Sequence, residues 1–213
     1  MDTKKRAQEI IDILKREYPD APQTYLHFNN EFELLIATIL SAHTTDRSVN
    51  SVTPELFKRF PTPQALAEAS LEEIRRIIRP VGTYNRKAVY IREAARGIVE
   101  QFGGEVPKTI EELSTLKGVS RKTANVVLSS AMGIDEGIVV DTHIGRVTQR
   151  LGLSSGKNPR EIEQDLMQTI PKTKWREYAR LLGAHGRRIC TARRPRCDEC
   201  AVQSYCQHIA RHE

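Results

Sequence analysis

All four cysteines of this 213-residue chain lie close together near its C-terminus, in a C-x6-C-x2-C-x5-C pattern formed by Cys190, Cys197, Cys200 and Cys206. Four thiolates this close can saturate one metal centre, because tetrahedral zinc and iron–sulfur clusters both accept four sulfur ligands. Zinc modules more often pair two C-x2-C hooks, and this chain has only one. The long first interval therefore favours an iron–sulfur cluster of the four-iron type, with zinc as the alternative.

Paired cysteines can also form disulfide bonds, which are typical of secreted or periplasmic proteins. Residues 1–11, MDTKKRAQEII, contain no apolar core of a signal peptide. We therefore expect a cytoplasmic protein. No apolar run approaches the roughly 20 residues needed to cross a bilayer, so we also expect it to be soluble, with no membrane partner.

The formal net charge of +6 suits an anionic partner such as a nucleic acid. Positive charge gathers around the first two cysteines, where no acidic residue interrupts Arg187, Arg188, Arg193, Arg194 and Arg196. A solvated basic loop is one interpretation of this run. The other is a surface that presents arginine to phosphates.

Signals for helix starts and ends recur along the chain, and no segment has the alternation and turn residues of a β-hairpin. Ser70 is a favourable N-cap, and Thr109 with Glu112 has the spacing of a capping box. Gly103 is placed to end a helix over residues 86–102. The apolar run at residues 32–40 predicts a buried helix. We therefore predict an all-α protein.

The most informative interior segment is LSTLKGVSRKTANVVL, residues 113–128. It predicts a short helix, a tight turn and a second helix that begins near Arg121. Gly118 permits a backbone conformation that side chains obstruct, and Ser120 is a favourable N-cap. The N–H groups at an open helix start bind phosphate without reading base sequence. Two tightly joined helices without a ligand are the alternative.

Lys122 lies in the first turn of this second helix, next to Arg121. A lysine is a nucleophile only as the free amine, and at a reference pKa of about 10.4 only about one in a thousand is free at neutral pH. The helix dipole, the adjacent cation and partial burial would lower the pKa of Lys122. It is therefore a candidate nucleophile, with a solvated surface lysine as the alternative.

Asp141 directly precedes the helical pattern THIGRV and has the position of an N-cap. A carboxylate held by backbone donors stays ionised, so it can also assist loss of a leaving group or steady a developing sugar cation. Capping and a chemical role are compatible at this position.

Together, these segments resemble the endonuclease III family, the bifunctional DNA glycosylases and abasic-site lyases of base excision repair. The resemblance rests on LKGVSRKTANVVL, VVDTHIGRV and the four-cysteine spacing. It extends to FELLIATILSAHTTDRSVN (residues 32–50) and VGTYNRKA (residues 81–88). It implies a helix–hairpin–helix fold in which Lys122 and Asp141 are catalytic.

The resemblance also implies two helical domains that flank a DNA-binding cleft. One would be a six-helix domain over residues 22–133, with the hairpin motif near 113–132. The other would combine residues 1–21 with 134–213 and carry a [4Fe–4S] cluster on the four cysteines. The implied partner is double-stranded DNA with an oxidised or ring-saturated pyrimidine or an abasic site, bound by a monomer.

In the implied reaction, Lys122 attacks the sugar C1′ and Asp141 assists departure of the base. The resulting Schiff base then leads to β-elimination, which cuts the strand on the 3′ side. Residues expected to contact DNA come from the hairpin, from two other loops and from the cysteine loop: Lys117, Gly118, Val119, Ser120, Arg121, His43, Thr83, Arg193 and Arg194.

Some positions depart from the family pattern. His43 stands where relatives often carry glutamine, and Thr83 stands where a bulky apolar wedge is common. Ser120 replaces the usual second glycine of the hairpin, and Lys117 a frequent proline. Because threonine unstacks bases less effectively than leucine, the pattern leaves lesion range and opposite-base preference open.

Two other functions are compatible with parts of this sequence. A monofunctional mismatch glycosylase would share the fold, although such relatives generally lack a lysine equivalent to Lys122. A non-catalytic iron–sulfur protein would bind damaged DNA without forming a Schiff base. Borohydride trapping of a covalent protein–DNA adduct separates both from the bifunctional enzyme.

Overall fold

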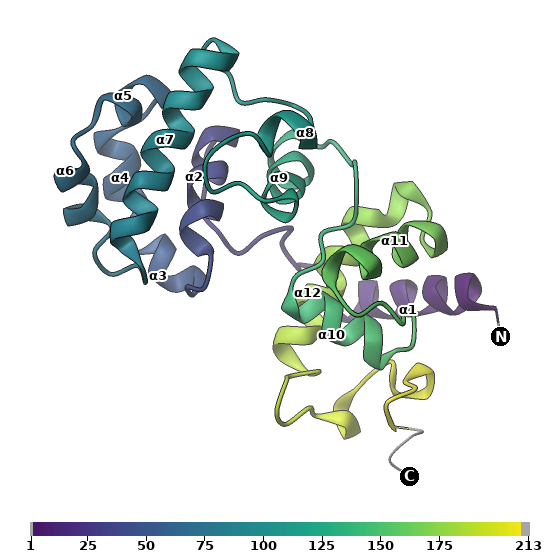
Figure 1. Cartoon of the computed structure of the whole chain (residues 1–213). Helices are drawn as coiled ribbons and strands as arrows, with labels where there is room; N and C mark the ends of the chain where they lie inside the picture. Colours follow the sequence, from purple (N-terminus) through teal and green to yellow (C-terminus); the bar gives the residue numbers. More distant parts are fainter. Residues whose placement is uncertain (1, 210–213) are drawn as a thin grey trace. The chain divides into compact units, whose positions relative to one another are not determined.

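The computed structural model describes residues 2–209, and every regular element in that range is helical, which confirms the predicted all-α class (Figure 1). The chain forms two compact units. Unit 1 combines the residues up to Gln23 with those from Gly137, and unit 2 is Thr24–Glu136. The domain limits expected from the resemblance, 22 and 133, lie close to these bounds. Within the described range, no helix is long and apolar enough to span a membrane.

Unit 2 is built around one buried helix, α2. Residues 32–40 of α2 are all buried, and the helix contacts α7 and α9. Asn30 caps α2 by accepting the backbone N–H of Glu33 at 2.9 Å. The elements of unit 2 are α2 (Glu31–Ser41), α3 (Asp46–Asn50), α4 (Thr53–Arg59), α5 (Pro63–Glu68), α6 (Leu71–Ile77), α7 (Tyr84–Phe102), α8 (Ile110–Leu113), α9 (Arg121–Val127) and the π-helical turn η1 (Leu128–Met132).

Unit 1 joins the N-terminal helix to the C-terminal part of the chain. The buried face of α1 consists of Ala7, Ile10, Ile11 and Leu14, and α1 packs against α12. Burial of each large aliphatic side chain contributes about 1.5–3 kcal/mol. The elements are α1 (Thr3–Glu17), α10 (Thr142–Arg150), α11 (Pro159–Thr169), η2 (Lys172–Lys174), α12 (Trp175–Arg188), η3 (Cys197–Glu199) and η4 (Gln203–Tyr205).

The predicted caps form in the structure. Ser70 accepts the backbone N–H of Glu73 at 3.2 Å at the start of α6. Thr109 accepts the backbone N–H of Glu112 at 3.2 Å, and its hydroxyl donates to that residue's carboxylate at 2.9 Å. The start of α7 was predicted two residues too late, because the carbonyl of Thr83 already accepts helical N–H groups.

Candidate functional site

The predicted helix–hairpin–helix segment forms within unit 2. Helix α8 ends at Leu113, the chain turns through residues 114–120, and α9 begins at Arg121. Ser120 caps α9 by accepting the backbone N–H of Thr123 at 3.2 Å, which confirms its predicted local role. The helix continues through η1, so the turn is anchored to a longer helical segment.

The hairpin turn requires glycine at position 118 for two reasons. Gly118 has φ +81°, in the left-handed region that side chains rarely adopt. A Cβ at this position would also lie 2.9 Å from Cδ2 of Tyr90 on α7. The Nζ atom of Lys117 lies 5.7 Å from the centroid of the same ring. The turn is therefore packed directly on Tyr90.

Residues of the turn differ in what they offer a ligand. Val119 is buried, and its N–H donates to the carbonyl of Leu116 at 3.1 Å, so this N–H is already paired within the turn. Gly118 and Ser120 differ from it, because their N–H groups have no hydrogen-bond partner within residues 2–209. Those two donors remain for an anion.

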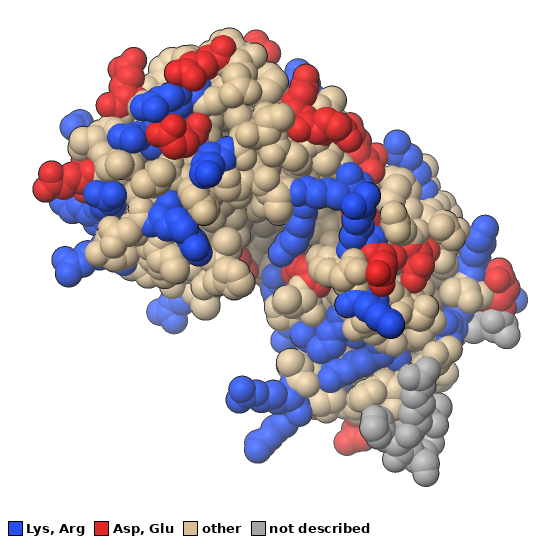
Figure 2. Space-filling view, in the orientation of Figure 1, with Lys and Arg blue, Asp and Glu red and all other residues tan. Residues whose placement is uncertain are grey.

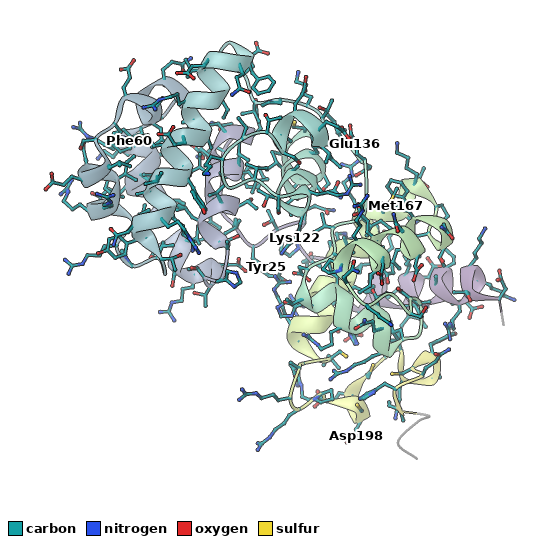
Figure 3. The ribbon with its side chains drawn as sticks, viewed as in Figure 1. Tyr25, Phe60, Lys122, Glu136, Met167 and Asp198 are labelled. Carbon is teal, nitrogen blue, oxygen red and sulfur yellow. The ribbon has the colours of Figure 1, made fainter. Side chains whose placement is uncertain are left out.

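Lys122 lies in the first turn of α9, beside Arg121, and Figure 3 labels its side chain. Both residues are exposed. This corrects the expectation that partial burial helps to free the amine of Lys122. Lys122 is the second residue of α9, after the Ser120 cap and Arg121, so it lies at the positive end of the helix and next to a second cation.

Asp141 caps α10, as predicted. Its Oδ1 atom accepts the backbone N–H groups of His143 and Ile144, both at 2.8 Å. Its Oδ2 atom lies 3.6 Å from Nη2 of Arg187, near the end of α12. One carboxylate oxygen therefore caps the helix while the other pairs with a guanidinium, and these two interactions together fix the orientation of the carboxylate.

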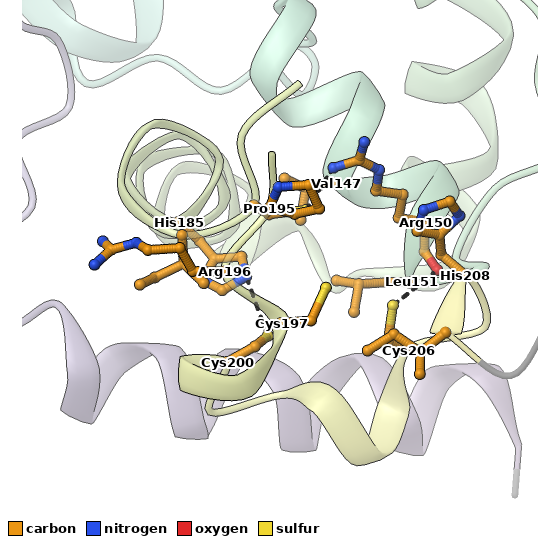
Figure 4. A pocket seen from close by; sticks show the side chains of 13 residues that line it. Val147, Arg150, Leu151, His185, Pro195, Arg196, Cys197, Cys200, Cys206 and His208 are labelled. Carbon is orange, nitrogen blue, oxygen red and sulfur yellow. Dashed lines mark hydrogen bonds between the residues drawn. The ribbon is translucent and has the colours of Figure 1, made fainter. Parts of the chain in front are cut away.

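All four cysteines line one pocket of unit 1, together with the apolar side chains of Val147 on α10, Leu151 just after it and Ile189 just after α12 (Figure 4). They are free thiols, so the disulfide alternative is not realised in the structure. Figure 4 shows the sulfur atoms of Cys197 and Cys206 beside the same space. Within the described range, no three His, Cys, Asp or Glu side chains converge on the position of a single metal ion. The sulfurs instead border a shared volume.

An arginine that the sequence did not single out holds the cysteine loop. Arg150 of α10 donates from Nη1 to Sγ of Cys190 at 3.3 Å and to the carbonyl of Thr191 at 2.8 Å. Its own carbonyl lies 3.5 Å from Sγ of Cys206. Because these partners are distant in the sequence, no local pattern indicated this role.

A buried histidine contacts a third cysteine. His185 of α12 is 2% exposed, and its Nε2 atom lies 3.6 Å from Sγ of Cys200. The hydroxyl of Tyr18 lies 2.9 Å from Nδ1 of the same ring. Burial lowers the pKa of His185 to about 4, so the ring is neutral at physiological pH. If Tyr18 donates to Nδ1, the ring proton lies on Nε2 and faces the sulfur.

The chemistry of this pocket suits a cationic sulfur-binding group. Burial raises the pKa of the Cys200 thiol to about 11, and the charges of the other three cysteines act in the same direction. Burial also raises the pKa of Cys197. Metal ligation requires thiolates, so a bound iron centre would supply the positive charge that this set of four sulfurs lacks. The residues present therefore fit an iron–sulfur cluster.

The arginine run beside the cysteines divides into two groups. Arg187 faces Asp141, Arg188 lies over the ring of Tyr18, and Arg196 pairs with Glu199 at 2.9 Å. The remaining two, Arg193 and Arg194, are exposed and have no ion-pair partner among residues 2–209. Figure 2 shows basic side chains projecting from the part of unit 1 that carries the C-terminal loop.

Comparison with known families accounts for both the hairpin and the cysteines. Residues 36–172 match the model of the HhH-GPD superfamily base excision DNA repair proteins. Residues 190–206 match the iron-sulfur binding domain of endonuclease III. An Endonuclease III from Synechocystis sp. is 49% identical over 203 residues, which span 95% of this chain and 92% of that protein. This chain belongs to the endonuclease III family. Its cofactor is accordingly a [4Fe–4S] cluster held by the four C-terminal cysteines, which confirms iron–sulfur over zinc.

Other endonuclease III proteins and solved structures agree with this assignment. Endonuclease III from Escherichia coli K12 is 42% identical, with 96% of each chain covered. A trapped endonuclease III–DNA covalent intermediate superimposes with a TM-score of 0.93, at 39% identity and over 100% of this chain and 99% of that one. A thermostable thymine-DNA glycosylase shares the fold alone, with a TM-score of 0.87 at 22% identity over 97% of this chain and 98% of that one.

Proposed function

We propose that Lys122 is the nucleophile and Asp141 the assisting carboxylate of this chain. Membership of the endonuclease III family makes the protein a bifunctional DNA glycosylase and abasic-site lyase that acts on oxidised pyrimidines. The observation that carries the residue assignment is the exposed side chain of Lys122 in the first turn of α9, two residues after the Ser120 cap. Lys122 is the only lysine of α9.

The proposed reaction begins when the free amine of Lys122 attacks C1′ of the damaged nucleotide. The C1′–N bond breaks, its electron pair leaves with the base, and the base is protonated. Loss of the sugar ring oxygen from C1′ leaves a Schiff base, which acidifies the proton on C2′. Removal of that proton expels the 3′ phosphate by β-elimination and cuts the strand. Asp141 stabilises the positive charge that develops on the sugar as the base departs.

Binding of damaged duplex DNA is proposed to use the hairpin and the exposed loops. The N–H groups of Gly118 and Ser120, which have no partner within residues 2–209, would hold a backbone phosphate together with Lys117 and Arg121. Arg193 and Arg194 would add contacts from the cysteine loop. The cluster, bound by the four cysteines, would keep this loop ordered. We place the protein in the cytoplasm, acting as a monomer on duplexes with oxidised or ring-saturated pyrimidines or abasic sites.

Borohydride trapping tests the lysine assignment. Incubation with abasic-site DNA and borohydride should yield a covalent adduct with the wild-type protein, and Lys122→Ala should abolish it because no amine remains to be reduced onto the sugar. Lys108→Ala is the matched control: Lys108 is also exposed in unit 2 and should trap like wild type. Strand cleavage without any trappable adduct would refute the Schiff-base scheme.

A further inference from the structure

A buried histidine lies between a cluster ligand and a tyrosine from the N-terminal part of the chain. His185 on α12 is 2% exposed, and its Nε2 atom lies 3.6 Å from Sγ of Cys200 (Figure 4). Its Nδ1 atom lies 2.9 Å from the hydroxyl of Tyr18, which directly follows α1. Both ring nitrogens therefore have a partner, one on each side of the imidazole.

The direction of these two hydrogen bonds follows from the chemistry of a ligand cysteine. A cysteine that binds iron is a thiolate, which accepts hydrogen bonds but has no proton to donate. The ring nitrogen that faces it must therefore carry hydrogen, so Nε2–H of His185 donates to the sulfur of Cys200. In a neutral ring Nδ1 is then an acceptor, and the hydroxyl of Tyr18 is the donor that satisfies it. The bonds run from Tyr18 to His185 to Cys200.

The tyrosine at the start of this relay is held in place. Tyr18 is 4% exposed, and the guanidinium carbon of Arg188 lies 5.4 Å from its ring centroid. Its carbonyl accepts a hydrogen bond from Nη1 of Arg180 at 3.4 Å. Burial raises the pKa of Tyr18 to about 12, so the hydroxyl keeps the proton that it donates. The donor is therefore fixed before any cofactor binds.

The main chain of His185 contacts a second ligand cysteine. Its carbonyl accepts the backbone N–H groups of Ile189 and Cys190, both at 2.9 Å. One residue thus bonds to two of the four cysteines, through its side chain and through its backbone. Hydrogen bonds to the sulfurs are among the factors that set the reduction potential of an iron–sulfur cluster. They favour the reduced form, because an added electron increases the negative charge on sulfur.

We propose that Tyr18 is a positioning residue that keeps Nε2–H of His185 directed at the Cys200 thiolate, and that this relayed hydrogen bond raises the reduction potential of the bound cluster. Without the Tyr18 hydroxyl, Nδ1 becomes a buried acceptor with no donor, and the ring loses the bond that holds Nε2 toward the sulfur. A cluster with a higher potential resists oxidation. This role concerns the cofactor, so its test does not depend on the assignment of Lys122.

The test uses the full-length protein loaded with its cluster. Tyr18→Phe removes only the hydroxyl, and His185→Leu removes the donor to the sulfur. The double variant shows whether Tyr18 acts through His185. Tyr178→Phe is the control, because Tyr178 is a buried tyrosine of unit 1 whose hydroxyl pairs with Oγ1 of Thr148 at 2.8 Å. Iron content is measured for each protein, and the reduction potential is measured by voltammetry.

His185→Leu should lower the ratio of reduced to oxidised cluster at a fixed electrode potential about tenfold, the expected loss for one hydrogen bond to a charged acceptor. For a one-electron couple this corresponds to about 59 mV. Tyr18→Phe should shift the potential in the same direction, and the double variant should match His185→Leu. Both single variants should also lose cluster absorbance faster than wild type in ferricyanide, a one-electron oxidant. Tyr178→Phe should match wild type in both assays.

Three results would overturn the proposal. A wild-type potential in fully loaded Tyr18→Phe would show that its hydroxyl does not act on the cluster. Additive shifts in the double variant would show that Tyr18 acts without His185. A shift of equal size in Tyr178→Phe would show that loss of any buried hydrogen bond in unit 1 changes the potential. If His185→Leu fails to retain iron, Tyr18→Phe decides alone, because it preserves the ring and its packing.

Discussion

Replacement of Gly118 by alanine tests how the hairpin turn is held. At φ +81° an L-residue costs about 1–2 kcal/mol. The added Cβ would also lie 2.9 Å from Cδ2 and 3.1 Å from Cβ of Tyr90, and overpacking of this kind costs about 1–3 kcal/mol. We therefore expect Gly118→Ala to lose about 2–5 kcal/mol of the unfolding free energy of unit 2.

Gly103→Ala is the control that separates the cost of the backbone angle from the cost of the contact with Tyr90. Gly103 also has a positive φ, +61°, but a Cβ there would meet no atom within 4 Å. Gly103→Ala should therefore lose only the backbone part, about 1–2 kcal/mol. Adding Tyr90→Ala to Gly118→Ala should relieve the overlap with the ring atoms but not with Cβ of residue 90, so a double-mutant cycle should show a favourable coupling between the two changes.

The assays are urea unfolding followed by circular dichroism and affinity for abasic-site duplex DNA at one fixed salt concentration. Gly118→Ala should lose more stability than Gly103→Ala, and only Gly118→Ala should also bind DNA more weakly. If Gly118→Ala and Gly103→Ala lose the same stability, the contact with Tyr90 is not a reason why position 118 requires glycine. Wild-type stability in Gly118→Ala would refute the reasoning altogether.

Two further predictions concern the carboxylate and the cluster. Asp141→Asn should slow base release roughly 100-fold or more in single-turnover assays, with DNA affinity nearly unchanged, because asparagine still caps α10 but lacks the charge. A wild-type rate in this variant would contradict the assigned role. The purified protein should be yellow-brown, with iron and sulfide in equal amounts by chemical analysis, and colourless protein with stoichiometric zinc would contradict the cluster assignment.

The fold was predictable where its signals are local. Ser70, Thr109, Ser120 and Asp141 cap their helices through hydrogen bonds to residues two or three positions away. Such bonds depend on the residue type and on the backbone of a single turn. A short sequence window therefore contains all the information they need.

The candidate site was predictable only in part. The interval between cysteines indicated four sulfurs on one centre, and the resemblance pointed to Lys122 and Asp141. Partial burial of Lys122 was expected and is not found, because exposure depends on what packs around α9 and not on the residues beside it.

By itself, the sequence determined the helical class, the caps and the chemical nature of the sulfur ligands, since each depends on residue type at short spacing. Tertiary structure alone decided which side chains from distant parts of the chain hydrogen-bond to one another. Lys87 meets Thr44 across 43 positions, Arg150 meets Cys190 across 40, and Tyr18 meets His185 across 167. These hydrogen bonds form only after separate segments of the chain have packed together, and no local pattern around either residue encodes its partner.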